Sequence, residues 1–380
     1  VEGLKCINLI FKASDHNKIM NYLTYINFKH FKLIFLKNLL LLTSILSLSS
    51  CTKDLVDEKS CDFFDENFAN KTSVVACSTL NDCAIVWSNE KKIKLIGNAT
   101  EATGLSHQNN KIYVTGWTYG GTGSVWVMDL DGSNQTQTEL QGKFSEGQRI
   151  TIHDGDIYVG GYFQNGSCFW KNGSKTNLTV NADSMSWGIE VDQNNNLFNV
   201  GYYMKSHSLI PSFWKNGTRK NLSKPRHGDG EAKYIQIVNN KKIIAGTTSV
   251  PHNFLGYITK PTYWVNGQRK TGDIGSVDDG WQNSEVFDMF VDDQENVYLA
   301  GFSQDMDLEY PTYWKNEKKH LMSNGELSGV IRGIEMINGE LVLAGTLSYF
   351  PGTPCIWVGE KTYVYDENAV GEVWDILVIN

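Results

Sequence analysis

The chain of 380 residues lacks the short motifs that mark common enzyme active sites. It contains no P-loop, no HExxH zinc motif and no Ser/His/Asp set at a known spacing. It also has no CxxC pair and no Cys/His cluster of the kind that holds zinc. The sequence therefore predicts no catalytic residue, no metal site and no cofactor.

The chain also has fewer basic than acidic residues. The chain has 34 Lys and Arg against 42 Asp and Glu, and six of the lysines but only two of the acids lie in residues 1–50. Residues 51–380 therefore carry a formal net charge of −12. Because phosphate binding needs a basic surface, this acidic body argues against nucleic acid as a partner. It fits an exported protein that stays soluble.

An apolar run long enough for an ordinary membrane span is missing too. Three lysines, Lys29, Lys32 and Lys37, flank the two parts of an apolar run, residues 33–36 and 39–48, and two serines and Cys51 follow it. A basic segment, an apolar segment and small residues in this order are typical of a secretory signal peptide. The alternative is a single transmembrane anchor, for which the run is short.

The Ser-Ser-Cys51 junction resembles the lipobox of bacterial lipoproteins. The resemblance implies cleavage before Cys51, acylation of that cysteine with palmitate, and a lipid-anchored protein at the bacterial outer membrane or cell surface. The Lys53-Asp54 pair resembles signals that send some lipoproteins to the surface. Residues 1–19 precede any normal signal, so Met20 is the more natural initiator.

This reading divides the chain into three parts. Residues 1–50 form the signal peptide, and residues 51–71 form the lipidated cysteine and a flexible, polar tether. Residues 72–380 form the folded domain, which is expected to be a monomer.

The folded part repeats one motif, which is clearest at Tyr310–Asn316 (YPTYWKN). Each copy has a small residue, one or two large apolar residues, a Trp and a polar turn, which is typical of a strand entering a tight hairpin. The copies are 39 to 50 residues apart, and their tryptophans are Trp87, Trp126, Trp170, Trp214, Trp264, Trp314 and Trp357.

A second repeated element is an apolar strand that ends in glycine. Its final residues are Gly116, Gly161, Gly201, Gly246, Gly301 and Gly345. A period of 40 to 50 residues, built from about four short strands, is typical of β-propeller blades. The segment Phe290–Gly301 resembles bacterial propeller repeats with the pattern VDxxGNVYVxG.

The two ends of the domain are predicted to complete one blade together. Residues 371–379 have the pattern of the first strand of a blade, but no second strand follows them. Residues 72–97 have the pattern of the second, third and fourth strands. Pairing them closes the ring at seven blades and removes an exposed sheet edge. The alternative is an open ring of six blades. The sixth blade shows the expected unit, with strands at 285–292, 296–302, 311–315 and 318–322.

Most recurring residues are predicted to be structural. The repeated tryptophans would pack between blades, and the glycines would allow close approach between sheets. Cys77 and Cys83 would lie on facing strands, where a disulfide is one option. The other option is that all cysteines are small core residues, which Cys168 and Cys355 favour because they stand two residues before a repeated Trp.

Binding is expected where the repeats differ. The loops at 202–211, 247–261, 303–311 and 347–354 are long and rich in aromatic residues, which is usual for binding sites on a rigid scaffold. Aligning the innermost strands predicts a ring at the channel mouth, with the register uncertain by one residue in blades 3 and 5. With two loop-face aromatics added, the candidate ligand-binding residues are Arg149, Trp187, Tyr234, Trp281, Phe287, Tyr310, Arg332 and Trp374. The alternative for the ring is inter-blade core.

The composition and repeats favour a non-catalytic binding or scaffolding module for a glycan or a protein partner on the loop face. The alternative is a carbohydrate-active enzyme, a glycoside hydrolase or lyase that uses acidic residues of the same face. The candidate carboxylates are Asp278, Asp279, Asp305, Asp307 and Glu309. Their separation in space would decide this question.

Overall fold

A computed structural model describes residues 73–379 except 82, 90, 165, 180–182, 253–255, 276–280, 306–307, 323–326, 348–351, 360 and 366–369. The predicted signal peptide, Cys51 and tether lie outside these residues. Within them, no helix has the length and apolar character needed to cross a membrane.

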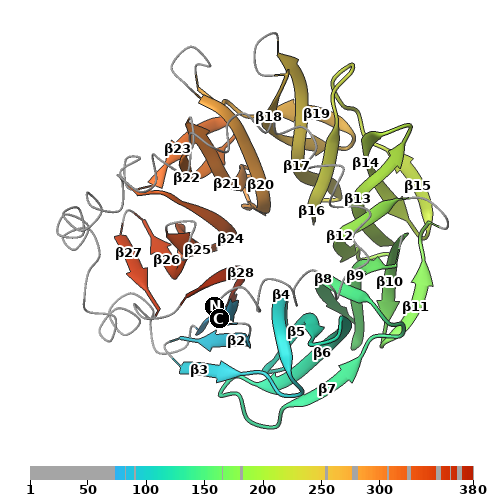
Figure 1. Ribbon diagram of the computed structural model, residues 1–380, viewed down its shortest axis with the longest axis vertical. Helices are drawn as coiled ribbons and strands as arrows, with labels where there is room; N and C mark the ends of the chain where they lie inside the picture. Colours follow the sequence, from blue (N-terminus) through green and yellow to red (C-terminus); the bar gives the residue numbers. More distant parts are fainter. Residues whose placement is uncertain are drawn as a thin grey trace, which may run out of the picture. The chain divides into compact units, whose positions relative to one another are not determined.

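The described residues form seven four-stranded antiparallel sheets arranged in a ring, the blades of a β-propeller (Figure 1). Blade 1 contains β28 (Gly371–Ile379), β1 (Ser73–Leu80), β2 (Cys83–Ser88) and β3 (Lys91–Lys94). Blade 2 contains β4 (Ala99–Gln108), β5 (Lys111–Thr118), β6 (Thr122–Asp129) and β7 (Thr136–Glu139). Blade 3 contains β8 (Ser145–His153), β9 (Asp156–Phe163), β10 (Gly166–Lys171) and β11 (Ser174–Asn177).

The remaining blades repeat this order from the innermost strand outward. Blade 4 contains β12 (Ser184–Val191), β13 (Leu197–Lys205), β14 (Ser208–Lys215) and β15 (Thr218–Asn221). Blade 5 contains β16 (Gly230–Val238), β17 (Lys241–His252), β18 (Gly256–Val265) and β19 (Gln268–Thr271). Blade 6 contains β20 (Trp281–Val291), β21 (Val297–Asp305), β22 (Leu308–Lys315) and β23 (Lys318–Leu321). Blade 7 contains β24 (Gly329–Ile337), β25 (Glu340–Leu347), β26 (Thr353–Val358) and β27 (Lys361–Val364).

The ring closes as the sequence predicted. β28 pairs antiparallel with β1, from Ser73 opposite Ile379 to Leu80 opposite Gly371. The first and last described strands therefore meet in blade 1 (Figure 1), and the open six-blade alternative is wrong.

The repeated tryptophans are core residues between blades, as predicted. Six are fully buried and Trp87 is 3% exposed. Several also tie their blade to the preceding one. Trp264 Nε1 donates to the Ser223 carbonyl at 2.8 Å, and Trp170 Nε1 donates to the Gln141 carbonyl at 3.0 Å. Burial of such a side chain stabilises each interface by roughly 3 kcal/mol.

The four described cysteines are all free thiols. Cys77 lies opposite Val86 and Cys83 opposite Leu80, so the two do not face each other and the disulfide option is wrong. Cys168 and Cys355 are fully buried, which agrees with the core option.

Three of the predicted long loops are instead hairpins that continue the second and third strands. In blades 4, 5 and 6 these strands pair out to Lys205, His252 and Asp305. These hairpins therefore project from one face of the propeller. The connections from the outermost strand of one blade to the innermost strand of the next lie on the same face. We call this the loop face. In the fourth predicted loop, residues 348–351 lie outside the described part.

Candidate functional site

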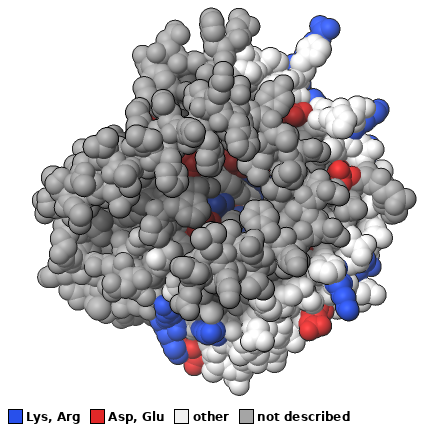
Figure 2. Space-filling view, in the orientation of Figure 1, with Lys and Arg blue, Asp and Glu red and all other residues white. Residues whose placement is uncertain are grey.

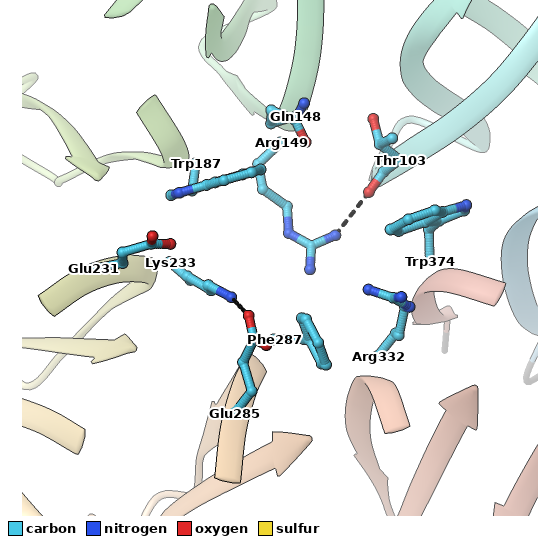
Figure 3. Close-up of a pocket in the computed structure, with 10 residues that line it drawn as sticks. All are labelled: Thr103, Gln148, Arg149, Trp187, Glu231, Lys233, Glu285, Phe287, Arg332 and Trp374. Atoms are coloured by element: carbon cyan, nitrogen blue, oxygen red, sulfur yellow. Dashed lines mark hydrogen bonds and ion pairs between the residues drawn. The ribbon is translucent and has the colours of Figure 1, made fainter. Parts of the chain in front are cut away.

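Every innermost strand is interrupted by a β-bulge at one equivalent position. There the register slips by one residue, which leaves one extra residue at this position in each blade. A bulge re-aims its extra side chain, here toward the channel. All seven extra residues line a cavity of about 230 Å³ on the channel axis (Figure 3). They are Thr103, Gln148, Trp187, Lys233, Phe287, Arg332 and Trp374.

The repeated glycines explain why the bulges can form. A Cβ on Gly301 would come within 1.7 Å of the Glu285 carbonyl oxygen, and a Cβ on Gly161 within 2.0 Å of that of Glu146. Each carbonyl belongs to the innermost strand of the same blade, two residues before the bulge residue. The prediction of close approach between sheets is therefore corrected, because the close approach lies within one sheet.

Aromatic and cationic side chains alternate through five successive bulges. Lys233 Nζ lies 6.0 Å from the Trp187 ring centroid and 4.7 Å from that of Phe287. The Arg332 guanidinium lies 4.5 Å from the Phe287 ring and 4.2 Å from the Trp374 ring. Cations over aromatic faces attract the ring quadrupole. Blades 4, 5, 6, 7 and 1 thus build a stacked crescent around the cavity (Figure 3).

Carboxylates hold both cations of the crescent. Lys233 forms an ion pair with Glu285, and Arg332 Nη2 lies 3.1 Å from Glu372 Oε2. The side chains of Lys233 and Arg332 are only 11% and 12% exposed. Blades 2 and 3 break the pattern with the polar side chains of Thr103 and Gln148, so the crescent leaves that side of the cavity without aromatic rings.

Arg149 forms the base of the cavity. It follows the bulge residue of blade 3, and its Nη1 donates to the Thr103 carbonyl at 2.8 Å and lies 3.1 Å from Asp375 Oδ2. Its Nη2 lies 3.9 Å from Asp288 Oδ1, and its guanidinium lies 5.6 Å from the Tyr234 ring. One side chain therefore braces blades 1, 2, 3, 5 and 6.

The charged groups at this base shift one another's pKa values. Burial lowers the pKa of Arg149, but Asp375 and Asp288 together raise it above its ordinary value, so the guanidinium stays charged. Burial raises the pKa of Asp288 to about 7, against the opposing effect of Arg149. The pKa of Asp375 is also raised by burial. The backbone N–H groups of Leu105 and Ile334 donate to Asp375 and Asp288 at 2.8 and 3.0 Å.

A ring of carboxylates lies above the crescent. Five blades carry Glu two residues before the bulge residue, at Glu101, Glu146, Glu231, Glu285 and Glu372. Burial raises the pKa of Glu231; nearby Lys233 lowers it and Glu285 raises it. Acidic and basic atoms are both visible in the central hollow of the space-filling view (Figure 2).

Glu309 adds a further carboxylate from the tall hairpin of blade 6. Burial raises its pKa, and the charge of Glu285 raises it further, whereas Arg332 lowers it. Its Oε2 is buried without a hydrogen-bond partner. Asp278, Asp279 and Asp307 lie outside the described residues.

The structure brings five of the eight predicted site residues into the cavity lining: Arg149, Trp187, Phe287, Arg332 and Trp374. Tyr234 lies one residue below, in the layer that also holds Gly104, so the predicted alignment was wrong by one residue in blades 2, 3 and 5. Tyr310, which pairs with Ser303 in blade 6, does not line the cavity. Trp281 opens β20 opposite Asp305, and its side chain lies outside the described part.

Sequence reasoning missed Thr103, Gln148, Lys233, Glu231 and Glu285. A signal for the three bulge residues among them was present, because in blades 2 to 7 a glycine of the second strand faces the innermost strand just before the bulge. Among the described residues, no three His, Cys, Asp or Glu side chains are grouped so that they could hold a metal ion.

No family model and no curated protein matches this sequence. Solved structures match over three quarters of the chain. The WD40 propeller domain of Doa1 has a TM-score of 0.49 and 13% identity, with 76% of this chain and 93% of that chain covered. A PL25 ulvan lyase has a TM-score of 0.48 and 9% identity, with 75% and 83% covered. The designed protein Ika8 has a TM-score of 0.42 and 14% identity, with 75% and 83% covered. Matches at this level carry no argument about function.

Proposed function

We propose that the protein is a non-catalytic glycan-binding module of the bacterial envelope, and that the cavity holds the end of a glycan chain. The observation that carries the proposal is the crescent of Trp187, Phe287 and Trp374 interleaved with Lys233 and Arg332. A sugar ring has apolar faces and hydroxyl edges. Aromatic rings complement the faces, and charged donors and acceptors fixed between them complement the hydroxyls.

The small volume of the cavity and its closed base favour a ligand that inserts only the end of its chain. Its volume of about 230 Å³ is below the roughly 300–1,000 Å³ of pockets that hold drug-sized ligands. Arg149 and its two aspartates close its base. A linear chain therefore cannot thread the propeller and would enter end first.

The charges favour a neutral glycan. Each cation in the lining already has a carboxylate partner: Lys233 has Glu285, Arg332 has Glu372 and Arg149 has Asp375. A polyanion would have to displace these partners and would meet the remaining rim carboxylates. Charge complementarity of this kind sets specificity more than affinity.

The test is a glycan array probed with the full wild-type chain, purified in mild detergent, and with the Phe287→Ala variant prepared in the same way. Phe290→Ala is the matched control, because Phe290 lies on the same strand below the Arg149 layer. We expect the wild type and Phe290→Ala to bind the same neutral glycans, and Phe287→Ala to bind about tenfold more weakly or not at all. Absence of glycan binding by the wild type would refute the proposal. Crosslinking on cells would then search for a protein partner.

The second candidate is a carbohydrate-active enzyme, which one observation favours. Glu231 and Glu285 lie in the same cavity, and burial raises the pKa of Glu231 while Glu285 is paired with Lys233. A carboxyl group with a raised pKa beside a second carboxyl group is the pairing that an acid/base glycosidase uses. Prolonged incubation with the array-selected glycan would show new reducing ends for a hydrolase, or an unsaturated product for a lyase. Under this candidate, Glu231→Gln would abolish turnover and keep binding.

Lipid anchoring is part of the proposal and rests on the sequence alone. Radiolabelled palmitate should label the wild type in a bacterial host and not Cys51→Ser, and the variant should leave the membrane fraction. Labelling that persists in Cys51→Ser would refute the assignment of this cysteine.

A further inference from the structure

Two large aromatic side chains stand out on the loop face near blades 2 and 3. Tyr119 is 87% exposed and Phe144 is 66% exposed. Tyr119 lies in the turn between β5 and β6, and Phe144 directly precedes β8. The function proposed above uses neither residue.

Both rings are carried by ordered backbone. Tyr119 N donates to the Asn98 carbonyl at 3.0 Å, and Gly121 N donates to Thr118 at 3.0 Å to close the turn. Ser145 N donates to the Gly121 carbonyl at 3.0 Å, which joins the turn to the residue after Phe144. The Phe144 ring lies next to Gly121, 3.6 Å from where a Cβ on that glycine would be. The two aromatic residues therefore occupy the same corner of the loop face.

Phe144 holds its exposed position at a conformational cost. Its φ of 56° lies in the left-handed region, which is strained for a bulky side chain. Its carbonyl accepts from Gln164 N at 3.3 Å, which helps to fix this conformation. Such strain persists where surrounding structure enforces it, and it is commonest at ligand-binding sites.

The second and third strands of the blades extend to different lengths on the loop face, and the side where they are short includes this corner. The tall hairpins of blades 4, 5 and 6 pair four, six and four residues beyond Gly201, Gly246 and Gly301. In blades 2 and 3 the equivalent strands pair only two residues beyond Gly116 and Gly161. The paired strands end equally low in blade 1, at Leu80, and in blade 7, at Leu347. With the base closed by Arg149, a chain leaves over this low side of the rim, and among the described residues blades 2 and 3 are the part of that side with exposed aromatic rings.

The strands of blades 2 and 3 connect the cavity to the exposed rings. β4 begins after Asn98, the residue that holds Tyr119, and contains Thr103 in the cavity. β8 begins after Phe144 and contains Gln148 in the cavity. Between these points each strand carries one carboxylate, Glu101 or Glu146, and Glu146 accepts a hydrogen bond from Gln148 at 3.4 Å. Carboxylates that could accept hydrogen bonds from sugar hydroxyls thus lie between the cavity and the aromatic corner.

We infer that Tyr119 and Phe144 form an outer subsite that stacks on the distal sugar rings of a neutral oligosaccharide whose end occupies the cavity. This inference rests on the glycan-binding function proposed above. It specifies that the ligand is an oligosaccharide of several residues, and that it leaves the cavity over blades 2 and 3.

The test uses neutral oligosaccharides of increasing length. Titration calorimetry of the full chain with cello-, xylo- and malto-oligosaccharides from the disaccharide to the hexasaccharide would identify the series that binds. In that series we expect affinity to rise with length by about tenfold or more, because the longer chains reach the second aromatic contact. The Tyr119→Ala/Phe144→Ala variant should remove this gain and bind the disaccharide as the wild type does.

Tyr257→Ala is the matched control, because Tyr257 is also an exposed aromatic residue, 56% exposed, on the tall hairpin of blade 5. It should keep the gain with length. Affinity that is independent of length, or a gain that survives in Tyr119→Ala/Phe144→Ala, would overturn the outer subsite and leave the cavity site intact. If none of these series binds, the same length series is made from the glycan that the array selects, and an array with no bound glycan would refute the inference together with the proposed function. An unchanged melting temperature would show that the double variant is folded.

Discussion

The guanidinium of Arg149 in blade 3 meets the carboxylate of Asp375 in blade 1 across the channel, with Nη1 and Oδ2 3.1 Å apart. Asp375 belongs to β28, the strand that closes the ring by pairing with β1. This contact therefore links the base of the candidate site to the closure of the fold.

Arg149→Met should destabilise the protein strongly. Removal of the guanidinium leaves the carboxylates of Asp288 and Asp375 buried without a cation, which typically costs about 3–5 kcal/mol. Urea unfolding would measure the loss. The triple variant Arg149→Met/Asp288→Asn/Asp375→Asn should regain much of the stability, because it removes the orphaned charges. Equal stability of Arg149→Met and wild type would contradict the bracing role.

Stability should fall as the pH rises from about 5 to about 8. Burial raises the pKa of Glu335 to about 8 and that of Glu190 to about 7, above the usual value for glutamate. The folded state therefore holds more protons than the unfolded state in this window, and its advantage is lost as these groups ionise. Thermal unfolding at several pH values checks the slope, and Glu335→Gln should flatten it. A flat profile would show that these groups ionise in the folded state at no cost, and a slope of opposite sign would contradict their raised pKa values.

Gly161→Ala should damage both fold and site, whereas Gly160→Ala should be mild. The new methyl of Gly161→Ala would lie 2.0 Å from the Glu146 backbone carbonyl, so the bulge that carries Gln148 must shift. At Gly160 the nearest atoms belong to side chains, at 3.2 Å. We expect Gly161→Ala to cost about 2 kcal/mol or more and to weaken glycan binding. Similar melting temperatures for the two variants would argue against the link between glycine and bulge.

The repeats predicted the fold well because each repeated residue has one structural role. The tryptophans recur where blades pack, and the final strand of the chain lacked a partner that only the first strands supplied. The register of the site was harder to predict, since a bulge adds a residue without changing the apolar pattern. That addition moved Arg149 and Tyr234 one layer below Trp187 and Phe287.

The contacts between side chains within the site could not be predicted from the sequence. Lys233 pairs with Glu285, and Arg149 with Asp375, across blades that only the closed ring brings together. Local patterns set which side chains a strand offers to the channel, but the partner of each charge depends on the ring as a whole. The tall hairpins of blades 4 to 6 were expected as loops because strand pairing beyond the repeat has no fixed sequence pattern.

The most direct test of the account is saturation-transfer NMR on the oligosaccharide that the array selects, with the full chain in detergent. We expect the strongest saturation on the terminal sugar, which lies in the cavity against the aromatic crescent, and its loss in Phe287→Ala but not in Phe290→Ala. Saturation confined to the distal sugars, or saturation of the terminal sugar that is unchanged in Phe287→Ala, would contradict end-first binding in this cavity.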